Sequence, residues 1–226
     1  MASSYYTNTL HVSFESVLAM DNPGMVSMFK ALTESGLQGF LGCPAVIYEA
    51  ALIDFFENAL VWDGVVISTV AGKLVEISEE LFAETFELPL EGLTNLSEIS
   101  KDLVFDAKSI VSLSGEPVST SGKNHEMTIE FRLLCDILAK TVSVKAGSFD
   151  ALTQEKFLMM AAIIWGVRIN WSRICFNILK DTITPGTRQA KGYAIQISLL
   201  LENFQNLELG ESSEFPSSDS NEEDSA

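Results

Sequence analysis

The stretch that decides the fold runs over twenty residues and reads Val70-Ala71-Gly72-Lys73-Leu74-Val75-Glu76-Ile77-Ser78-Glu79-Glu80-Leu81-Phe82-Ala83-Glu84-Thr85-Phe86-Glu87-Leu88-Pro89. Its first part predicts the turn and the second strand of a β-hairpin, and its second part predicts a helix. Residues 65–70, just before it, are mostly β-branched, which favours the first strand of the same hairpin. We therefore expect a hairpin that is followed directly by a helix.

Individual residues in this stretch explain each of these expectations. Gly72 accepts a positive φ at little cost, so Ala71-Gly72 suits a two-residue turn. Ser78 is a good N-cap, because its hydroxyl can accept a hydrogen bond from a free backbone N–H of the first helical turn. Glu79 and Glu80 follow in that turn, where the helix dipole favours negative charge. Pro89 ends the helix, because the residue before a proline resists helical dihedrals.

A further helix is expected over residues 48–60, which contain the phrase Phe55-Phe56-Glu57-Asn58. Together with the stretch at 70–89, this segment resembles gag-like proteins of plant retroelements, the group described as the putative plant transposon protein domain. Members of that group carry an aromatic-rich Phe-Tyr-x-Asn phrase before a Val-x-Gly turn. Phe56 stands where tyrosine is commoner in the group.

A second zone of resemblance lies in the C-terminal half, where four helices are expected between residues 125 and 205. The segment Phe157–Ile164 is apolar on nearly all sides, which predicts a central buried helix. It is followed by Gly166-Val167-Arg168-Ile169-Asn170, which is similar to the Gly-x-x-Ile-Asn turn between two apolar helices of the same domain. The two zones cover 44–90 and 128–202. The resemblance implies a non-enzymatic, retroelement-derived protein that self-associates, and we expect it to do so through a helical face.

These patterns together predict a mainly α fold with one β-hairpin. The patterns leave open whether the fold is one compact helical domain or two lobes. They also predict that the chain has a disordered acidic C-terminal tail. The expected organisation is an N-terminal segment at 1–21, a helical lobe with the hairpin at 22–95, a linker at 96–124, a second helical lobe at 125–205 and the tail at 206–226.

Charge is unevenly distributed along the 226 residues, whose formal net charge is −17. Residues 1–100 carry 14 acidic and 2 basic side chains, whereas residues 101–201 carry 9 acidic and 12 basic ones. Lysine and arginine provide most of the affinity for nucleic-acid phosphates, so only the second segment is suited to such contacts. The alternative function is therefore nucleic-acid binding, expected to be weak, through a local basic face at 168–191. Its candidate contacts are Arg168, Arg173, Lys180, Arg188 and Lys191.

No pattern of catalytic residues is present in the sequence. Gly72-Lys73 is followed by Leu74 rather than by serine or threonine, so it is not a phosphate-binding P-loop. His11 and His125 are the only histidines, and no cluster of cysteine and histidine has the spacing of a zinc site. We therefore expect no enzyme activity, no catalytic or cofactor-binding residues, no metal site, no cofactor and no small-molecule substrate.

Three cysteines, Cys43, Cys135 and Cys175, lie far apart and are odd in number, which favours reduced thiols in an intracellular protein. The longest apolar run, Phe157–Val167, is about half the length that a membrane-spanning helix requires. No membrane association is expected, and the sequence does not distinguish cytoplasm from nucleus.

Overall fold

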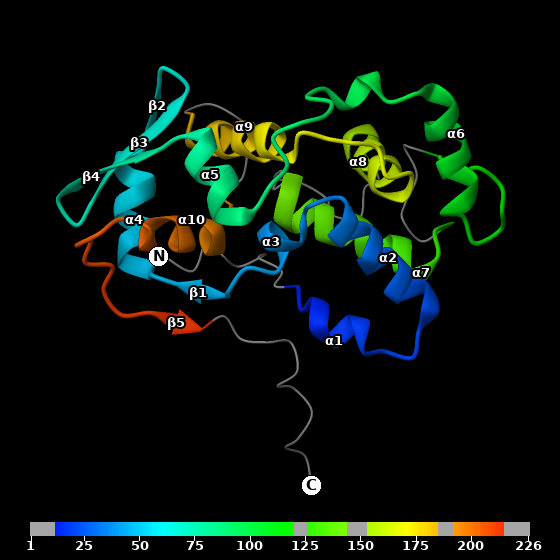
Figure 1. The fold of residues 1–226 in the computed structure, drawn as a ribbon, viewed down its shortest axis with the longest axis horizontal. Coiled ribbons are helices and arrows are strands. Elements are labelled where there is room, and N and C mark those ends of the chain that lie inside the picture. The colour runs from blue at the N-terminus through cyan, green and yellow to red at the C-terminus, as the bar shows by residue number, and fades with distance from the viewer. Residues whose placement is uncertain (1–11, 120–125, 144–152, 185–191, 215–226) are drawn as a thin grey trace, which may run out of the picture.

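The computed structural model describes residues 12–119, 126–143, 153–184 and 192–214. It confirms the predicted fold class, because helices dominate and a small antiparallel sheet contains the expected hairpin. Figure 1 shows this sheet at one end of the long axis and a group of helices at the other. The buried apolar side chains of both ends belong to one hydrophobic cluster, so the two predicted lobes share a core.

The N-terminal part begins with three helices, α1 (Phe14–Leu18), α2 (Pro23–Glu34) and α3 (Gln38–Leu41). Asn22 caps α2, with its side-chain oxygen 3.1 Å from the backbone nitrogen of Met25. Helix α3 lies within the glycine-rich segment 36–42. A Cβ atom on Gly39 would lie 2.3 Å from the carbonyl oxygen of Phe86, so glycine lets α3 pack directly on the end of a later helix.

The sheet is covered on its inner face by helix α4 (Glu49–Asn58). Its strands β2 (Leu60–Trp62), β3 (Val65–Val70) and β4 (Lys73–Ile77) are antiparallel and adjacent in that order. The hydroxyl of Ser68, on the inner face of β3, donates a 2.9 Å hydrogen bond to the carbonyl of Phe55 on α4. This bond holds the middle of the sheet against the helix that precedes it.

Two tight turns with positive φ connect the three strands. Ala71 and Gly72 form the predicted turn between β3 and β4, with φ values of 48° and 74°. Asp63 and Gly64 form another such turn between β2 and β3, with φ values of 48° and 80°. The predicted hairpin is therefore present, and strand β2 extends it into a three-stranded sheet.

Helix α5 (Glu79–Phe86) follows the hairpin directly, as predicted. The hydroxyl of Ser78 accepts a hydrogen bond from the backbone nitrogen of Leu81 at 3.2 Å and so caps the helix. The helix ends at Glu87, which adopts the left-handed conformation two residues before Pro89.

The predicted linker at 96–124 carries ordered structure in its described part. A short 3₁₀ turn, η2 (Leu96–Glu98), leads to helix α6 (Lys101–Ile110), whose Ala107 is completely buried. The indole nitrogen of Trp165 donates a 3.0 Å hydrogen bond to the carbonyl of Leu103 on α6. This segment therefore packs on the core rather than bridging two separate lobes, because α6 has an apolar face of its own. Residues 120–124 lie outside the described residues.

The C-terminal half supplies four α-helices: α7 (Ile129–Ile137), α8 (Gln154–Ile164), α9 (Trp171–Ile183) and α10 (Ala194–Glu202). A π-helical turn, η4 (Leu138–Ser143), continues α7. Helix α8 is buried along most of its length, in agreement with its predicted central position. No helix within these described parts is long and apolar enough to cross a membrane.

The described part of the predicted tail, 206–214, lies against the body of the protein. Strand β5 (Ser213–Glu214) pairs with β1 (Val46–Ile47), and the Lys73 side chain donates to the carbonyl of Asn206. Ordered contacts therefore extend beyond the predicted boundary at residue 206. The rest of the predicted tail, 215–226, lies outside the described residues.

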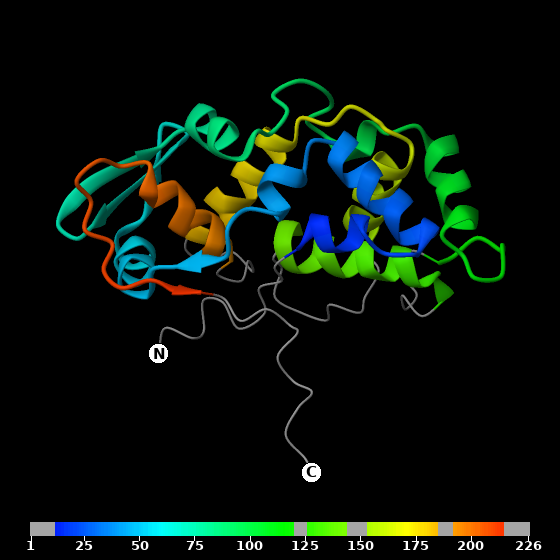
Figure 2. The same cartoon turned by 60° about the horizontal axis from the view of Figure 1, so that its bottom comes forward.

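An aromatic cluster joins the two halves of the chain at the centre of the molecule. Phe82 on α5 lies 5.5 Å from Phe176 on α9 and 5.9 Å from Phe40 on α3, between ring centroids. Phe40 in turn lies 5.1 Å from Tyr193, which precedes α10. Figure 2 shows these helices between the sheet end and the α6 end of the molecule.

We predict that Phe82→Ala lowers the free energy of unfolding by about 3–5 kcal/mol, because it removes a fully buried ring and leaves a cavity. Urea unfolding followed by circular dichroism measures this change. Phe105→Ala on α6 is the control, since its side chain is 60% exposed and its loss should change stability by less than about 0.5 kcal/mol. Equal effects of the two substitutions would contradict the position of Phe82 at the centre of the core.

We also predict that stability falls as the pH rises from 9 toward 12. Burial raises the pKa of the Cys175 thiol from 9.0 to about 12, whereas the unfolded chain releases this proton near pH 9. The protonated thiol therefore makes its full contribution to the free energy of unfolding below pH 9, and this contribution is lost as the pH rises through the pKa of the folded state. Urea midpoints measured at several pH values should fall less steeply for Cys175→Ala than for the wild type. Identical pH profiles would contradict this assignment.

Candidate functional site

Three of the five basic residues predicted to contact nucleic acid lie in the described residues. Arg173 and Lys180 are two turns apart on helix α9, and Arg168 lies in the turn before that helix. The other two, Arg188 and Lys191, lie outside the described residues.

Both basic residues of α9 are engaged by side chains of the protein itself. The Nε atom of Arg173 lies 3.1 Å from a carboxylate oxygen of Glu79, at the start of helix α5. The Nζ atom of Lys180 lies 5.2 Å from the centroid of the Phe176 ring, within the range of a cation–π interaction. The Arg173–Glu79 pair is partly exposed, so it contributes only about 0–1 kcal/mol, but it places a negative charge directly beside the predicted basic face.

The first turn of α5 adds a second carboxylate near Arg173. Hydrogen bonds from its own backbone and from the Ser78 side chain, with a further contribution from Arg173, lower the pKa of Glu80. Glu80 therefore stays ionised at neutral pH. An approaching phosphate would meet two carboxylates, Glu79 and Glu80, as well as the arginine.

Arg168 belongs to a different part of the surface. It lines a cavity of about 280 Å³ together with Glu34 and Glu91. Its carbonyl oxygen accepts a 2.9 Å hydrogen bond from the backbone nitrogen of Leu93, which fixes this turn against the segment after α5. Each of the three described basic positions therefore has an acidic or aromatic side chain of the same protein nearby, and no common phosphate-binding face results.

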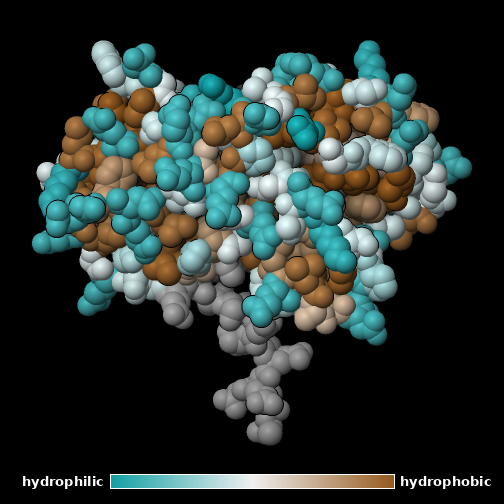
Figure 3. Space-filling view, viewed as in Figure 1, coloured by the Kyte–Doolittle hydropathy of each residue, from teal (hydrophilic) through white to brown (hydrophobic). Residues whose placement is uncertain are grey.

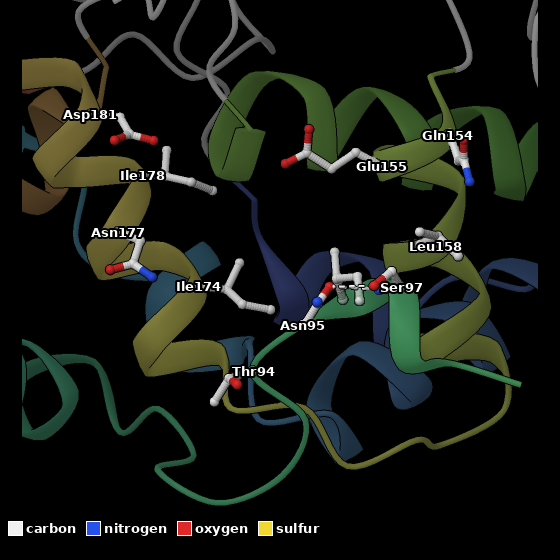
Figure 4. Close-up of a pocket in the computed structure, with 11 residues that line it drawn as sticks. Thr94, Asn95, Ser97, Gln154, Glu155, Leu158, Ile174, Asn177, Ile178 and Asp181 are labelled. Carbon is white, nitrogen blue, oxygen red and sulfur yellow. Dashed lines mark hydrogen bonds between the residues drawn. The ribbon is translucent and has the colours of Figure 1, made fainter.

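A groove of about 560 Å³ lies beside this region, between residues 94–97, α8 and α9 (Figure 4). Its floor is apolar and its rim carries amides, hydroxyls and two carboxylates. The lining residues are Thr94, Asn95, Leu96, Ser97, Gln154, Glu155, Leu158, Ile174, Asn177, Ile178 and Asp181. The Asn95 side chain accepts hydrogen bonds from the backbone nitrogen and the hydroxyl of Ser97 and so shapes the rim. None of these lining residues is lysine, arginine or histidine, so the groove is not suited to an anionic ligand.

Within the part of the chain that the structure describes, no three or more His, Cys, Asp or Glu side chains are grouped so that they could hold a metal ion. The three cysteines are buried free thiols.

The outer face of the three-stranded sheet carries exposed apolar side chains on its two edge strands, β2 and β4. Strand alternation and register place its members opposite the face that α4 covers. They are Leu60 and Trp62 on β2, Val65, Ile67 and Thr69 on β3, and Leu74 and Glu76 on β4. We call these seven residues the outer sheet face. Trp62 is 71% exposed, and Leu74 is 64% exposed.

Figure 3 shows apolar surface at the sheet end of the molecule, at the upper left, bordered by hydrophilic residues. Exposed apolar patches that are rimmed by polar residues are candidate interaction sites. The outer sheet face is therefore a candidate interaction surface.

The sequence interpretation missed this surface, because it did not assign strand β2. The signal is nevertheless present in Leu60-Val61-Trp62-Asp63-Gly64-Val65-Val66, where Asp-Gly stands between two apolar runs. Asp-Gly is among the strongest short signals for a two-residue hairpin turn. Alternation along β2 and β3 then assigns Trp62 and Val65 to the same face.

Comparison with models of known protein families finds no match to the chain, and neither curated proteins nor solved structures give one. The resemblance to gag-like proteins therefore depends on the residues of its two zones alone.

We predict that the protein binds single-stranded RNA no more tightly than about 10⁻⁶ M at physiological salt, the range of non-specific binding. Fluorescence anisotropy with a labelled oligonucleotide measures this. Changing Arg173 and Lys180 together to glutamate should weaken the binding no more than the same change at Lys101 and Lys108 on α6, which serves as a charge-matched control. Tight binding that only the first double variant abolishes would favour the nucleic-acid alternative.

Proposed function

We propose that this chain is a non-enzymatic, retroelement-derived gag-like protein that self-associates. The observation that carries the proposal is the outer sheet face, which keeps Trp62 and Leu74 largely exposed to water. Large apolar side chains in water are costly, and association with another surface removes that cost. The proposal differs from the initial expectation in the element it uses, which is a sheet rather than a helical face.

The way the two zones of resemblance contact each other supports the origin we propose. Pro89 lies near the end of the first zone, and its carbonyl accepts a 3.2 Å hydrogen bond from the backbone nitrogen of Ser172 on α9. The turn of the second zone ends at Asn170, whose side chain donates a 2.6 Å hydrogen bond to the carbonyl of Leu90. Two segments that are about eighty residues apart in sequence therefore form a single structural unit, as expected of one domain.

Asn170 has a second role in this unit. Its side-chain oxygen accepts a 2.8 Å hydrogen bond from the backbone nitrogen of Arg173 and so caps helix α9. Gly92, with φ of 114°, allows the segment after α5 to lie close to the turn before α9, because a Cβ atom there would lie 2.5 Å from the carbonyl oxygen of Arg168. The Gly-x-x-Ile-Asn turn thus has a structural explanation that involves no ligand, which supports a structural rather than a catalytic role for it.

The proposal includes an intracellular location. The three free, buried cysteines support it, because a reducing compartment keeps unpaired thiols in this form. Cys43 and Cys175 are also poor nucleophiles, since burial raises the pKa of each thiol to about 12.

Sedimentation velocity over a wide range of protein concentration tests self-association. We expect the weight-average mass to rise above the 24.7 kDa of the single chain as the concentration increases. Association should not weaken as the salt concentration rises, because salt weakens charge pairs but also screens the repulsion between copies that each carry a formal charge of −17. A mass that stays at 24.7 kDa up to the highest soluble concentration would contradict the proposal.

A further inference from the structure

We infer that a second copy of this chain docks on the outer sheet face, so that two sheets pack face to face about a two-fold axis. This inference rests on the proposed self-association and specifies the surface and the geometry through which it occurs.

The register places the apolar residues of this face in neighbouring rows. Trp62 is paired with Val65, and Leu60 is paired with Ile67 in the next row. Leu74 follows on β4, paired with Thr69. These side chains form a continuous apolar strip that crosses the sheet from the β2–β3 turn toward the β3–β4 turn.

This strip is exposed because the two faces of the sheet differ in what covers them. On the inner face, Val66, Val70, Val75 and Ile77 are at most 1% exposed. On the outer face, Leu60 is still 49% exposed. An aromatic side chain presents about 150–250 Å² to water, so the 71% exposure of Trp62 leaves roughly 100–180 Å² uncovered. Burial of this area is the main energetic gain available to a docking partner.

The low charge of the face makes a second copy a suitable occupant. Glu76 is the only ionisable residue among the seven, and it lies at one side, on β4. A two-fold contact brings each surface against itself, so a strongly charged surface would repel its own copy. An apolar face with one peripheral carboxylate avoids this repulsion, even though the whole chain carries a formal charge of −17.

The positions of the two most exposed residues suit such an axis. Trp62 and Leu74 stand at opposite corners of the face, on different edge strands and at opposite ends of β3. A two-fold axis that lies between the two sheets and runs perpendicular to the line from Trp62 to Leu74 exchanges these two corners. It therefore places Trp62 of each copy over Leu74 of the other, with the strands of the two sheets crossing at a steep angle.

The size of the face sets the strength of the contact. Strands lie about 4.8 Å apart and rise about 3.3 Å per residue, so the face measures roughly 14 Å by 20 Å. This is well below the roughly 800 Å² per partner that a standard stable interface buries. We therefore expect a weak dimer that is populated only at high protein concentration and dissociates on dilution.

Single substitutions test this geometry. Trp62→Glu and Leu74→Glu each place a carboxylate within the proposed contact, at positions that are exposed in the single chain and so tolerate it. Leu113→Glu is the matched control, because Leu113 is 64% exposed, like Leu74, but lies beyond α6 at the other end of the molecule. Urea unfolding of each variant checks that the fold is retained.

Sedimentation velocity should show dimers for the wild type and Leu113→Glu, and single chains for Trp62→Glu and Leu74→Glu at the same concentration. The sheet geometry is wrong if only Leu113→Glu dissociates, or if all three variants dissociate. In both cases the proposed self-association stands. The same holds if the two sheet variants associate like the wild type. A monomeric wild type would overturn both proposals.

A second measurement uses the fluorescence of Trp62. Its emission should move to shorter wavelength as the concentration rises, because the indole leaves water when the dimer forms. Trp62→Phe keeps an apolar side chain at this position but removes the signal, so the shift should be absent from that variant while dimers still form. A shift that persists in Trp62→Phe would come from Trp165 or Trp171 and would overturn the assignment.

Discussion

The contact between Phe82 and Phe176 is the interaction on which the rest of the structure depends. It joins helix α5, which follows the hairpin, to helix α9, which lies some ninety residues later in the chain. Phe40 and Tyr193 extend this aromatic contact to α3 and α10. Because aromatic side chains bury large areas, these few rings bring together elements that would otherwise share little surface. The position of the sheet, which is attached to α5 through β4, follows from this contact.

The same contact determines the electrostatic surroundings of the basic residues. When α5 packs on α9, the dipole-favoured acids at the start of α5 come to lie beside Arg173. A charge count along the sequence assigns a positive balance to residues 101–201, because it treats the two halves separately. In the folded protein, Glu79 from the acidic segment 1–100 forms an ion pair with Arg173 from the basic segment 101–201. Packing therefore removes much of the positive character that the nucleic-acid alternative requires.

Local signals made a large part of the fold predictable. The turn at Ala71-Gly72, the cap at Ser78 and the cap at Asn22 each depend on residues within a few positions, and all three are present in the structure. Features that depend on distant partners were not predictable in this way. Helix α6 reads as part of a linker because its buried residue Ala107 contacts elements far away in sequence. Likewise, residues 213–214 read as tail because their partner, β1, lies near the start of the chain. For the candidate surface, the Asp63-Gly64 turn signal was sufficient in principle to predict strand β2. The exposure of the outer sheet face could not be inferred, since it depends on which face of the sheet α4 covers.

The pairing of β1 with β5 has a consequence for the synthesis of the protein. These strands are separated by more than 160 residues, and Gln196 on α10 donates a 3.1 Å hydrogen bond to the carbonyl of Phe40, 156 positions earlier. Such contacts form only after the residues up to 214 have left the ribosome. The hairpin and α5 are local enough to form during translation, whereas β1 and α3 must wait for their C-terminal partners. During that interval Phe40 lacks its partners Tyr193 and Gln196, so its apolar surroundings stay exposed and the nascent chain is more prone to aggregation.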